Sequence, residues 1–211
     1  MKTVIFDLDN CLCPTTESGA DLYDPAFTAI RIANDGSVAD QALASAFSDM
    51  WSHAYDWVAR KYCFTPAMID AGWQALSQVE VNKPLVGYAD LHLLATVPAE
   101  RFLVTSGFRR LQESKIRALG IAAQFRKVFV DAIDVSPRAG KYALFQEIIA
   151  QYALEVSDVV VVGDNPESEL AAARSLGLVA VQILRPGVAP SEVATEYVRD
   201  LHDLISWLHR R

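Results

Sequence analysis

Short apolar, β-branched stretches alternate with longer stretches of helical periodicity along most of the chain. Strands that alternate with helices favour right-handed crossovers and a parallel sheet covered on both faces. The pattern therefore predicts an α/β fold with a three-layer α/β/α, Rossmann-like core. Strands are expected at Thr3–Phe6, Arg101–Thr105, Lys127–Val130, Asp158–Val162 and Leu178–Ile183. Helices are expected at Tyr88–Ala95, Arg109–Leu119, Lys141–Tyr152, Glu167–Leu176, and from Ser191 or Tyr197 to Leu208.

The segment between Cys13 and Leu85 interrupts this rhythm, because it contains no convincing strand. Roughly seventy residues are too many for a connecting loop, so we expect a small all-helical domain over the carboxyl ends of the strands. Residues 15–82 would form this insert, and residues 1–14 and 83–211 would form the core. The chain crossings near Pro14–Ser18 and Asn82–Leu85 would be its hinges. Its expected helices are Pro25–Ala33, Val38–Lys61 and Pro66–Ser77, the last started by Thr65 as the capping residue.

Composition narrows the class of protein. The chain has 211 residues, of which 52% are apolar, so it can bury a sizeable core. Its formal net charge of −7 argues against a nucleic-acid polymer as partner. The three cysteines Cys11, Cys13 and Cys63 match neither a disulfide framework nor a zinc site. No signal peptide and no run long enough to span a membrane is evident, so we expect a cytoplasmic protein. We expect it to be a monomer or a homodimer.

The first candidate for chemistry is Asp7-Leu8-Asp9, directly after the first apolar run. An aspartate there can attack phosphorus as a nucleophile, and its neighbour can transfer protons. Carboxylates this close together repel each other and favour a cation, which makes Mg²⁺ the expected cofactor. From this segment alone the alternative stays open that the second aspartate caps a turn.

A later strand end and a helix start add candidate phosphate ligands. The strand ending at Thr105 and Ser106 places a hydroxyl near the backbone N–H groups of the next helix, where an oxyanion can bind. The alternative role for Ser106 is an ordinary helix cap. Lys141 opens a helix against the preference of the helix dipole, which fits a lysine directed at phosphate; most single lysines are solvated surface residues.

The apolar strand at Asp158–Val162 ends in Gly163-Asp164, and a carboxylate follows at Glu169. Asp164 lies at the strand tip and could complete a magnesium site with Asp7. Glu169 could steer a water at the metal, although acidic residues in a first helical turn also complement the dipole, as we expect for Glu167.

The ordered set Asp7-x-Asp9, Thr105, Lys141 and Gly163-Asp164 with Glu169 resembles the haloacid dehalogenase-like hydrolase superfamily, and the helical insert looks like its C1-type cap. The resemblance implies that Asp7 forms an aspartyl-phosphate and that Asp9 protonates the leaving group and then activates water. It implies Mg²⁺ on the side chains of Asp7 and Asp164 and the backbone carbonyl of Asp9, with Glu169 assisting. Phosphate would be bound by Thr105, Ser106, Lys141 and Asn10.

Within that superfamily, true dehalogenases lack the second aspartate and work without metal, so Asp9 indicates phosphoryl chemistry. Two residues depart from the family pattern: Cys11 stands where Thr or Val is usual, and Glu169 where Asp is common. The opening Asp7-Leu8-Asp9-Asn10-Cys11-Leu12 is also similar to that of pyrimidine 5′-nucleotidase-like members, which makes a nucleoside monophosphate one candidate substrate.

Substrate choice would depend on the insert. Trp51, Tyr55 and Val58 share one face by helical spacing and are expected in its core. His53 and Trp57 project elsewhere and could reach the cleft. Arg109, directly after the second motif, could hold a second anionic group, or could lie on the surface of its helix.

The sequence thus predicts a Mg²⁺-dependent phosphatase acting on a small phosphorylated metabolite. A phosphomutase of the β-phosphoglucomutase type is the second hypothesis, because such an enzyme would use the same aspartyl-phosphate under a cap that excludes water. A non-catalytic binding protein of the same fold is the third.

Overall fold

The computed structural model, which describes residues 2–211, contains one six-stranded sheet that is parallel throughout. The strand order is β3-β2-β1-β4-β5-β6. Strands β1 and β4 lie at the centre, and their residues are buried on both faces, as the uninterrupted valine run predicts. The bounds are β1 Thr3–Phe6, β2 Glu100–Gly107, β3 Lys127–Ala132, β4 Val159–Gly163, β5 Val179–Ile183 and β6 Glu196–Val198.

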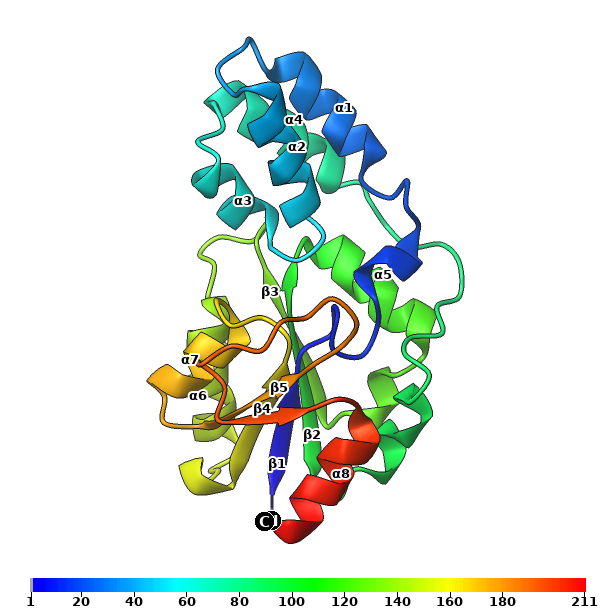
Figure 1. Ribbon diagram of the computed structural model, residues 1–211, viewed down its shortest axis with the longest axis vertical. Coiled ribbons are helices and arrows are strands. Elements are labelled where there is room, and N and C mark those ends of the chain that lie inside the picture. The colour runs from blue at the N-terminus through cyan, green and yellow to red at the C-terminus, as the bar shows by residue number, and fades with distance from the viewer. Residues whose placement is uncertain (1) are drawn as a thin grey trace.

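Helices cover both faces of the sheet (Figure 1). Helices α5 (Arg109–Leu119) and α8 (Leu201–Arg210) pack on one face, together with the short 3₁₀ helix η2 (Leu91–Thr96). Helices α6 (Gly140–Gln151) and α7 (Glu169–Ser175) pack on the other. Each face has its own buried apolar cluster, so the expected three-layer α/β/α fold is confirmed.

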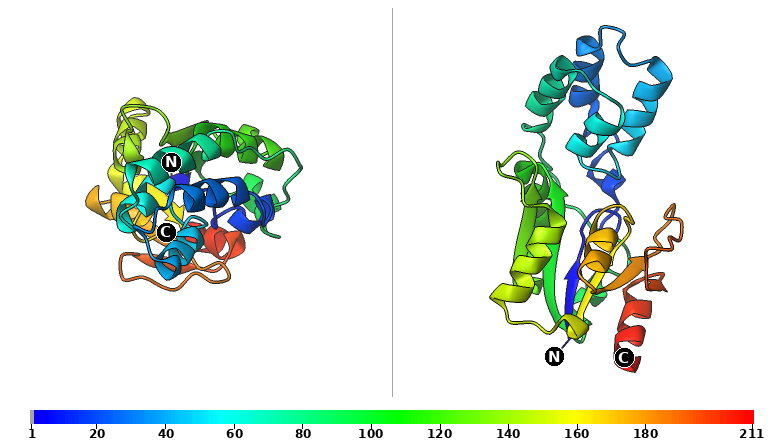
Figure 2. Two further views of the ribbon diagram at one scale, coloured as in Figure 1. Left: turned by 90° about the horizontal axis from the view of Figure 1, so that it is seen from above. Right: turned by 90° about the vertical axis from the view of Figure 1, so that its left-hand side faces the viewer.

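Four further helices form a lobe above the carboxyl ends of the strands (Figures 1 and 2). This helical lobe consists of α1 (Asp24–Ala33), α2 (Asp40–Asp49), α3 (Tyr55–Lys61) and α4 (Pro66–Leu76). It has an apolar cluster of its own, which includes Ile30, Phe47 and Met68. Thr65 caps α4 as predicted, because its hydroxyl accepts a hydrogen bond from the backbone N–H of Met68 at 3.3 Å.

The single helix expected over Val38–Lys61 is wrong. The chain leaves α2 after Asp49, turns through Trp51–His53 and starts α3 after Ala54, whose backbone is extended. An unbroken helix of that length would extend about 36 Å, far longer than the other helices of the lobe. The break lets both halves pack in the lobe and directs the turn toward the sheet.

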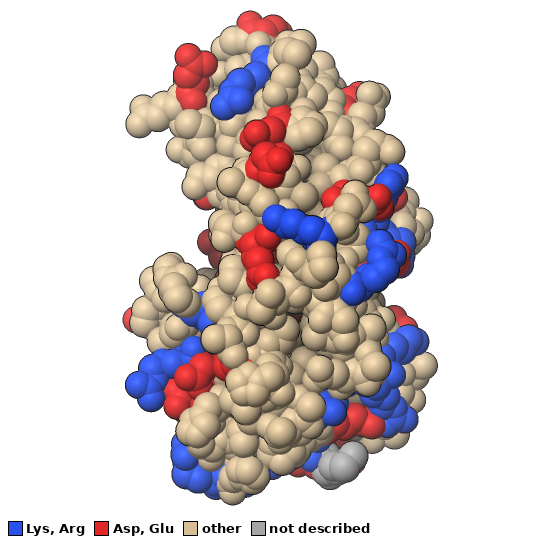
Figure 3. Space-filling model, turned by 90° about the vertical axis from the view of Figure 1, so that its right-hand side faces the viewer, with Lys and Arg blue, Asp and Glu red and all other residues tan. Residues whose placement is uncertain are grey.

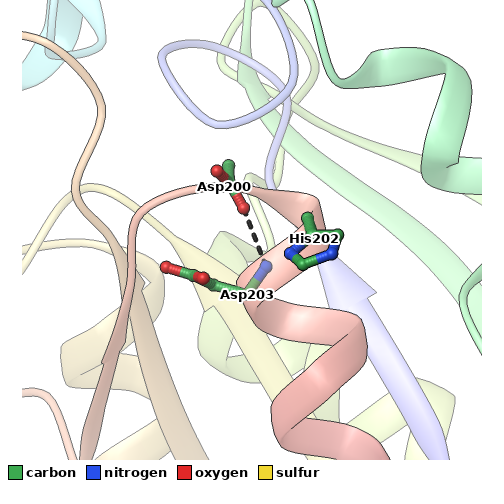
Figure 4. Close-up of side chains that lie close together, drawn as sticks. All are labelled: Asp200, His202 and Asp203. Carbon is green, nitrogen blue, oxygen red and sulfur yellow. Dashed lines mark hydrogen bonds between the residues drawn. The ribbon is translucent and has the colours of Figure 1, made fainter.

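The end of the chain also differs from the expectation. Tyr197 belongs to β6, which pairs with β5, and α8 begins only at Leu201. Its start is fixed by Asp200, whose carboxylate accepts the N–H of Asp203 at 2.7 Å (Figure 4). The carboxylate of Asp203 pairs with Arg199. The side chains of Asp200, His202 and Asp203 lie close together, and capping accounts for the bonds among them.

Two other boundaries change. The segment Tyr88–Ala95 is a 3₁₀ helix at Leu91–Thr96 instead of an α-helix, and α7 begins at Glu169, so Glu167 precedes it. No helix within residues 2–211 is long and apolar enough to cross a bilayer. On the face seen in Figure 3, positive and negative side chains are interspersed.

Candidate active site

A cavity of about 120 Å³ lies between the helical lobe and the carboxyl ends of the central strands. Its floor comes from residues at or just after the carboxyl ends of β1, β2 and β4 and from Lys141 at the start of α6. Its roof comes from the lobe, mainly from the turn between α2 and α3. Parallel strands point their carboxyl ends to one edge, which explains why motifs far apart in sequence meet here. The floor includes Asp7, Asp9, Thr105, Lys141, Asp164 and Glu169.

Three carboxylates and one ammonium form the centre of the floor. The Nζ atom of Lys141 lies 2.8 Å from Oδ1 of Asp7 and 2.8 Å from Oε2 of Glu169. Oxygen atoms of Asp7, Asp164 and Glu169 all lie within 4.8 Å of one another. Lys141, Asp7 and Glu169 are buried, so this group carries an excess of negative charge away from water. Hard oxygen ligands in this number suit Mg²⁺.

The pKa values reflect that excess charge. Burial raises the pKa of Asp7 to about 7, although the positive charge of Lys141 lowers it in part. Burial and the charges of Glu169 and Asp7 raise the pKa of Asp164 to about 9. Burial alone would lower the pKa of Lys141, but the two carboxylates beside it outweigh burial and raise it. A divalent cation at this place would relieve the repulsion.

Gly163 makes room for Glu169. A Cβ atom at position 163 would collide with the Glu169 side chain, which lies over the strand tip. Both carboxylate oxygens of Glu169 already have partners, since Oε2 accepts from Lys141 and Oε1 accepts the N–H of Asn165 at 2.7 Å. By contrast, the carboxylate of Asp164 accepts no hydrogen bond from the side chain of any other residue in 2–211, and its hydrogen bond is with its own backbone.

Asp9 has different neighbours. Both of its carboxylate oxygens lie within 2.9 Å of Nζ of Lys115, and Oδ2 also accepts from Nε2 of Gln112 at 3.1 Å. Lys115 is 1% exposed, whereas the Asp9 side chain keeps 22% of its surface and lines the cavity. Burial lowers the pKa of Lys115, but the charge and hydrogen bonds of Asp9, together with Tyr23 and Cys13, outweigh burial and raise it.

The three expected phosphate ligands besides Lys141 all line the cavity. Thr105 is 1% exposed, and its hydroxyl has no hydrogen bond to another residue within 2–211. The Ser106 hydroxyl does not cap α5 and instead donates to Oδ2 of Asp131 at 2.9 Å. The Asn10 side chain accepts from the N–H and the hydroxyl of Thr15, which fixes the loop after β1. Thr105 is therefore the least engaged of the three.

The structure separates the three residues expected to select the substrate. His53 and Trp57 both line the cavity, with their rings stacked 3.9 Å apart between centroids. Arg109 does not reach it: its backbone N–H donates to Asp134, and its half-exposed side chain pairs with Glu113 on the outer face of α5. The expectation that Arg109 faces the cleft is wrong, because the start of α5 directs this side chain outward.

Two polar contacts add to the packing of Tyr55 and Trp73 against Phe108 in joining the helical lobe to the rest of the protein. Arg138, after β3, pairs with Asp56 of α3 and also with the buried Asp131. The Asn165 side chain donates to the carbonyl of Ser52 at 3.1 Å. These contacts hold the lobe against the strand ends.

The two chain segments that lead into and out of the lobe are tied together by Glu17. Its carboxylate accepts the N–H groups of Val86 and Gly87. Glu17 lies within the first expected hinge, Pro14–Ser18, and Val86 follows the second, Asn82–Leu85.

Several residues of the site were not identified from the sequence, namely Lys115, Gln112, Asp131 and Arg138. A signal existed for Lys115, which stands four residues after Leu111 on the apolar side of α5, where a lysine needs a buried partner. The others carry no local signal, because their partners lie elsewhere in the chain. Cys11, at the position that departs from the family pattern, donates to the Val162 carbonyl at 3.7 Å and is buried.

A family model for haloacid dehalogenase-like hydrolases matches residues 1–177. The chain belongs to the haloacid dehalogenase-like hydrolase family. No curated protein matches its sequence. The family assignment makes the protein a hydrolase of this type, and the matched region contains every motif residue of the cavity floor.

Solved structures of haloacid dehalogenase-like proteins share the fold across nearly the whole chain. YfnB from Bacillus subtilis, bound to magnesium, has a TM-score of 0.65 at 14% identity, covering 98% of each chain. A phosphatase from Thermococcus onnurineus has a TM-score of 0.64 at 21% identity over 99% of this chain and 98% of its own. A 2-haloacid dehalogenase from Pseudomonas syringae has 0.57 at 19% identity over 100% and 99%. Since both phosphatases and dehalogenases share this fold, the residues of the site must distinguish the chemistry.

Proposed function

We propose that the protein is a Mg²⁺-dependent phosphatase that hydrolyses a small phosphomonoester through an aspartyl-phosphate on Asp7. The observation that carries this proposal is the arrangement at the strand ends. The carboxylates of Asp7 and Asp164 lie close together, and Lys141 lies beside Asp7. The second aspartate of the motif, Asp9, faces the same cavity. Chemistry at a carbon–halogen bond would need neither Asp9 nor a cation.

The residues present fit a magnesium ion. The carboxylate of Asp164, which no other side chain in 2–211 contacts by a hydrogen bond, and the raised pKa values of Asp7 and Asp164 fit a site that binds a divalent cation. We assign its ligands to the side chains of Asp7 and Asp164 and the backbone carbonyl of Asp9. Glu169 would act from outside, by orienting Lys141, because both its oxygens already accept hydrogen bonds. When bound, Mg²⁺ would neutralise the charge of the phosphoryl group and of the attacking carboxylate.

The chain's own residues would then carry out two steps. In the first, a carboxylate oxygen of Asp7 attacks phosphorus, the bond to the leaving oxygen breaks, and Asp9 gives that oxygen a proton. In the second, water attacks the same phosphorus, gives a proton to Asp9, and releases Asp7 and inorganic phosphate. Lys141 and the hydroxyl of Thr105 hold the phosphoryl oxygens, with Ser106 and Asn10 shaping the pocket around them.

We further propose that the helical lobe, residues 15–82, acts as a cap that selects the leaving group. The part of the cavity lined by the lobe is aromatic and apolar, with His53 and Trp57 among its residues, and Lys141 is the only Lys or Arg that lines the cavity within residues 2–211. This supports a small leaving group without a second anionic charge. A larger ester such as a nucleoside monophosphate would require the lobe to move away from the strand ends.

The proposal is tested by measuring phosphate release from a panel of esters. The panel contains alkyl phosphates, sugar phosphates, phosphorylated carboxylic acids and nucleoside monophosphates, each with Mg²⁺ and with excess EDTA. We expect turnover only with Mg²⁺, strongest for small uncharged leaving groups, and none in Asp7→Asn. Turnover in EDTA, or activity retained in Asp7→Asn, would refute the proposal. Isomerisation of a sugar phosphate without phosphate release would instead identify a mutase.

A further inference from the structure

The buried lysine of α5 has no role in the chemistry described so far. Lys115 is 1% exposed, and its Nζ atom lies 2.8 and 2.9 Å from the two oxygens of Asp9. A lysine in this position loses its hydration, and only Asp9 accepts hydrogen bonds from it within residues 2–211. Such burial is unusual for a lysine without a specific partner.

The two side chains that contact the Asp9 carboxyl share one property: each presents a donor to it. An ammonium has three donors and no acceptor, and Gln112 presents its Nε2 group, which is also a donor. Gln112 is itself fixed, since the same Nε2 donates to the Ser106 carbonyl at 3.1 Å. When Asp9 carries a proton, neither of the two nitrogen atoms that face the carboxyl can accept it, so the O–H bond points away from them. The exposed side of Asp9 faces the cavity.

We propose that Lys115 is a positioning residue that holds the Asp9 carboxyl against α5, so that its proton is presented only to the leaving group and to the attacking water. This inference rests on the proposed function. Lys115 does not line the cavity, so it acts on the reaction only through Asp9. Gln112 supports the same orientation from the neighbouring turn of the helix.

The test compares two substrates of similar shape, the ester isopropyl phosphate and the mixed anhydride acetyl phosphate, whose leaving groups differ in their need for a proton. Isopropyl phosphate releases an alkoxide, which must be protonated as it leaves, whereas acetyl phosphate releases acetate, which need not be. The ratio kcat/KM covers only steps up to departure of the leaving group, while kcat also includes hydrolysis of the aspartyl-phosphate. The variant Lys115→Met keeps the apolar stem and removes the ammonium.

For Lys115→Met we expect kcat/KM on isopropyl phosphate to fall about 100-fold, the scale of general acid catalysis. On acetyl phosphate we expect kcat/KM to stay within about threefold, with kcat and KM falling together because the second step is slowed. Binding of inorganic phosphate should stay unchanged. Equal losses of kcat/KM on both substrates would show that Lys115 has a merely structural role. No loss on isopropyl phosphate would show that Lys115 has no role in the reaction. Either result overturns the inference.

Two further variants guard against misfolding. Ser114→Ala is the matched control, because Ser114 is also fully buried on α5 but bonds to Val81 and Leu111 instead of Asp9. It should leave the ratio of the two kcat/KM values unchanged. The double variant Asp9→Asn/Lys115→Met removes both charges of the pair, and it should be no slower on isopropyl phosphate than Asp9→Asn. An additional loss would mean that Lys115 acts by another route.

The two proposals fail in different ways. If the wild-type protein with Mg²⁺ hydrolyses neither of these two substrates nor any member of the panel, the phosphatase proposal fails. If the wild-type protein is active and the ratio of its two kcat/KM values does not change in Lys115→Met, only the proposal for Lys115 fails.

Discussion

Replacing the nucleophile should make the metal-free protein more stable at alkaline pH while it abolishes turnover. In Asp7→Asn the side chain keeps its shape and an oxygen that can accept from Lys141, but it loses a negative charge buried beside Glu169 and Asp164. The carboxyl of Asp7 has a pKa of about 7 in the folded protein, against an ordinary value of 3.8. The variant thus removes a charge that the fold disfavours.

The magnitude follows from that shift. A difference of about three units, at 1.36 kcal/mol each, corresponds to about 4 kcal/mol of destabilisation when Asp7 is ionised. This shift already includes the attraction to Lys141, so it is the net cost of the ionised carboxyl. The gain for Asp7→Asn at pH 8 is then about 4 kcal/mol, or a rise in Tm of about 8–16 °C for a chain of this size.

The sign of the pH dependence is fixed by the raised pKa. Folded Asp7 binds its proton more tightly than unfolded Asp7, so its contribution to stability is fully present below about pH 4 and is lost as pH rises through about 7. At pH 5 the folded wild type is already protonated there, and the advantage of the variant should shrink by about 2–3 kcal/mol.

The assay is thermal unfolding in EDTA at pH 5 and pH 8, followed by circular dichroism. Asp70→Asn serves as control, because Asp70 is an exposed carboxylate on α4, and its difference from wild type should be the same at both pH values. A lower Tm for Asp7→Asn than for wild type at pH 8, or an equal gain at both pH values, would refute the reasoning about the buried charges.

Three other outcomes are expected. Lys141→Met leaves the buried carboxylates without their cation, so in EDTA at pH 8 it should lose about 3–5 kcal/mol of stability, a loss that Mg²⁺ reduces; an unchanged Tm would contradict the pairing. At a concentration of 100 Kd, Mg²⁺ should stabilise the wild type by about 2.7 kcal/mol. A fixed lower concentration of Mg²⁺ should shift Tm more at pH 8 than at pH 5, because Asp7 and Asp164 must lose protons to bind the ion. Equal shifts at the two pH values would argue against this site. Asp56→Asn removes the ion pair with Arg138 and should raise KM up to about fivefold with little change in kcat, measured by steady-state phosphate release; an unchanged KM would mean that this contact does not favour the closed lobe.

The sequence predicted the parts of the fold that have a local cause. Buried strands such as Val159–Gly163 carry an apolar run whatever surrounds them, and the parallel arrangement follows from their alternation with helices. Because such strands end at one edge, the candidate residues after three of them meet in one cavity. Their placement thus follows from topology.

The features that were missed depend on partners distant in the chain. Glu196–Val198 becomes a strand because β5 offers it an edge, and the helix expected over Val38–Lys61 breaks because the lobe must fold back over the sheet. Lys115 stands on the apolar side of its helix, which indicates a buried partner, but only the structure identifies that partner as Asp9. Arg109 follows a motif directly, but the direction of its side chain is set by the orientation of α5.

The central claim, phosphoryl transfer to Asp7, is tested most directly by trapping the intermediate. The protein is quenched in acid during turnover of acetyl phosphate with Mg²⁺ and reduced with borohydride, which converts a phosphorylated aspartate to homoserine, and its peptides are mapped by mass spectrometry. We predict homoserine at position 7 alone, dependent on Mg²⁺. Turnover without any reduced residue, or with the label at another aspartate, would contradict the account.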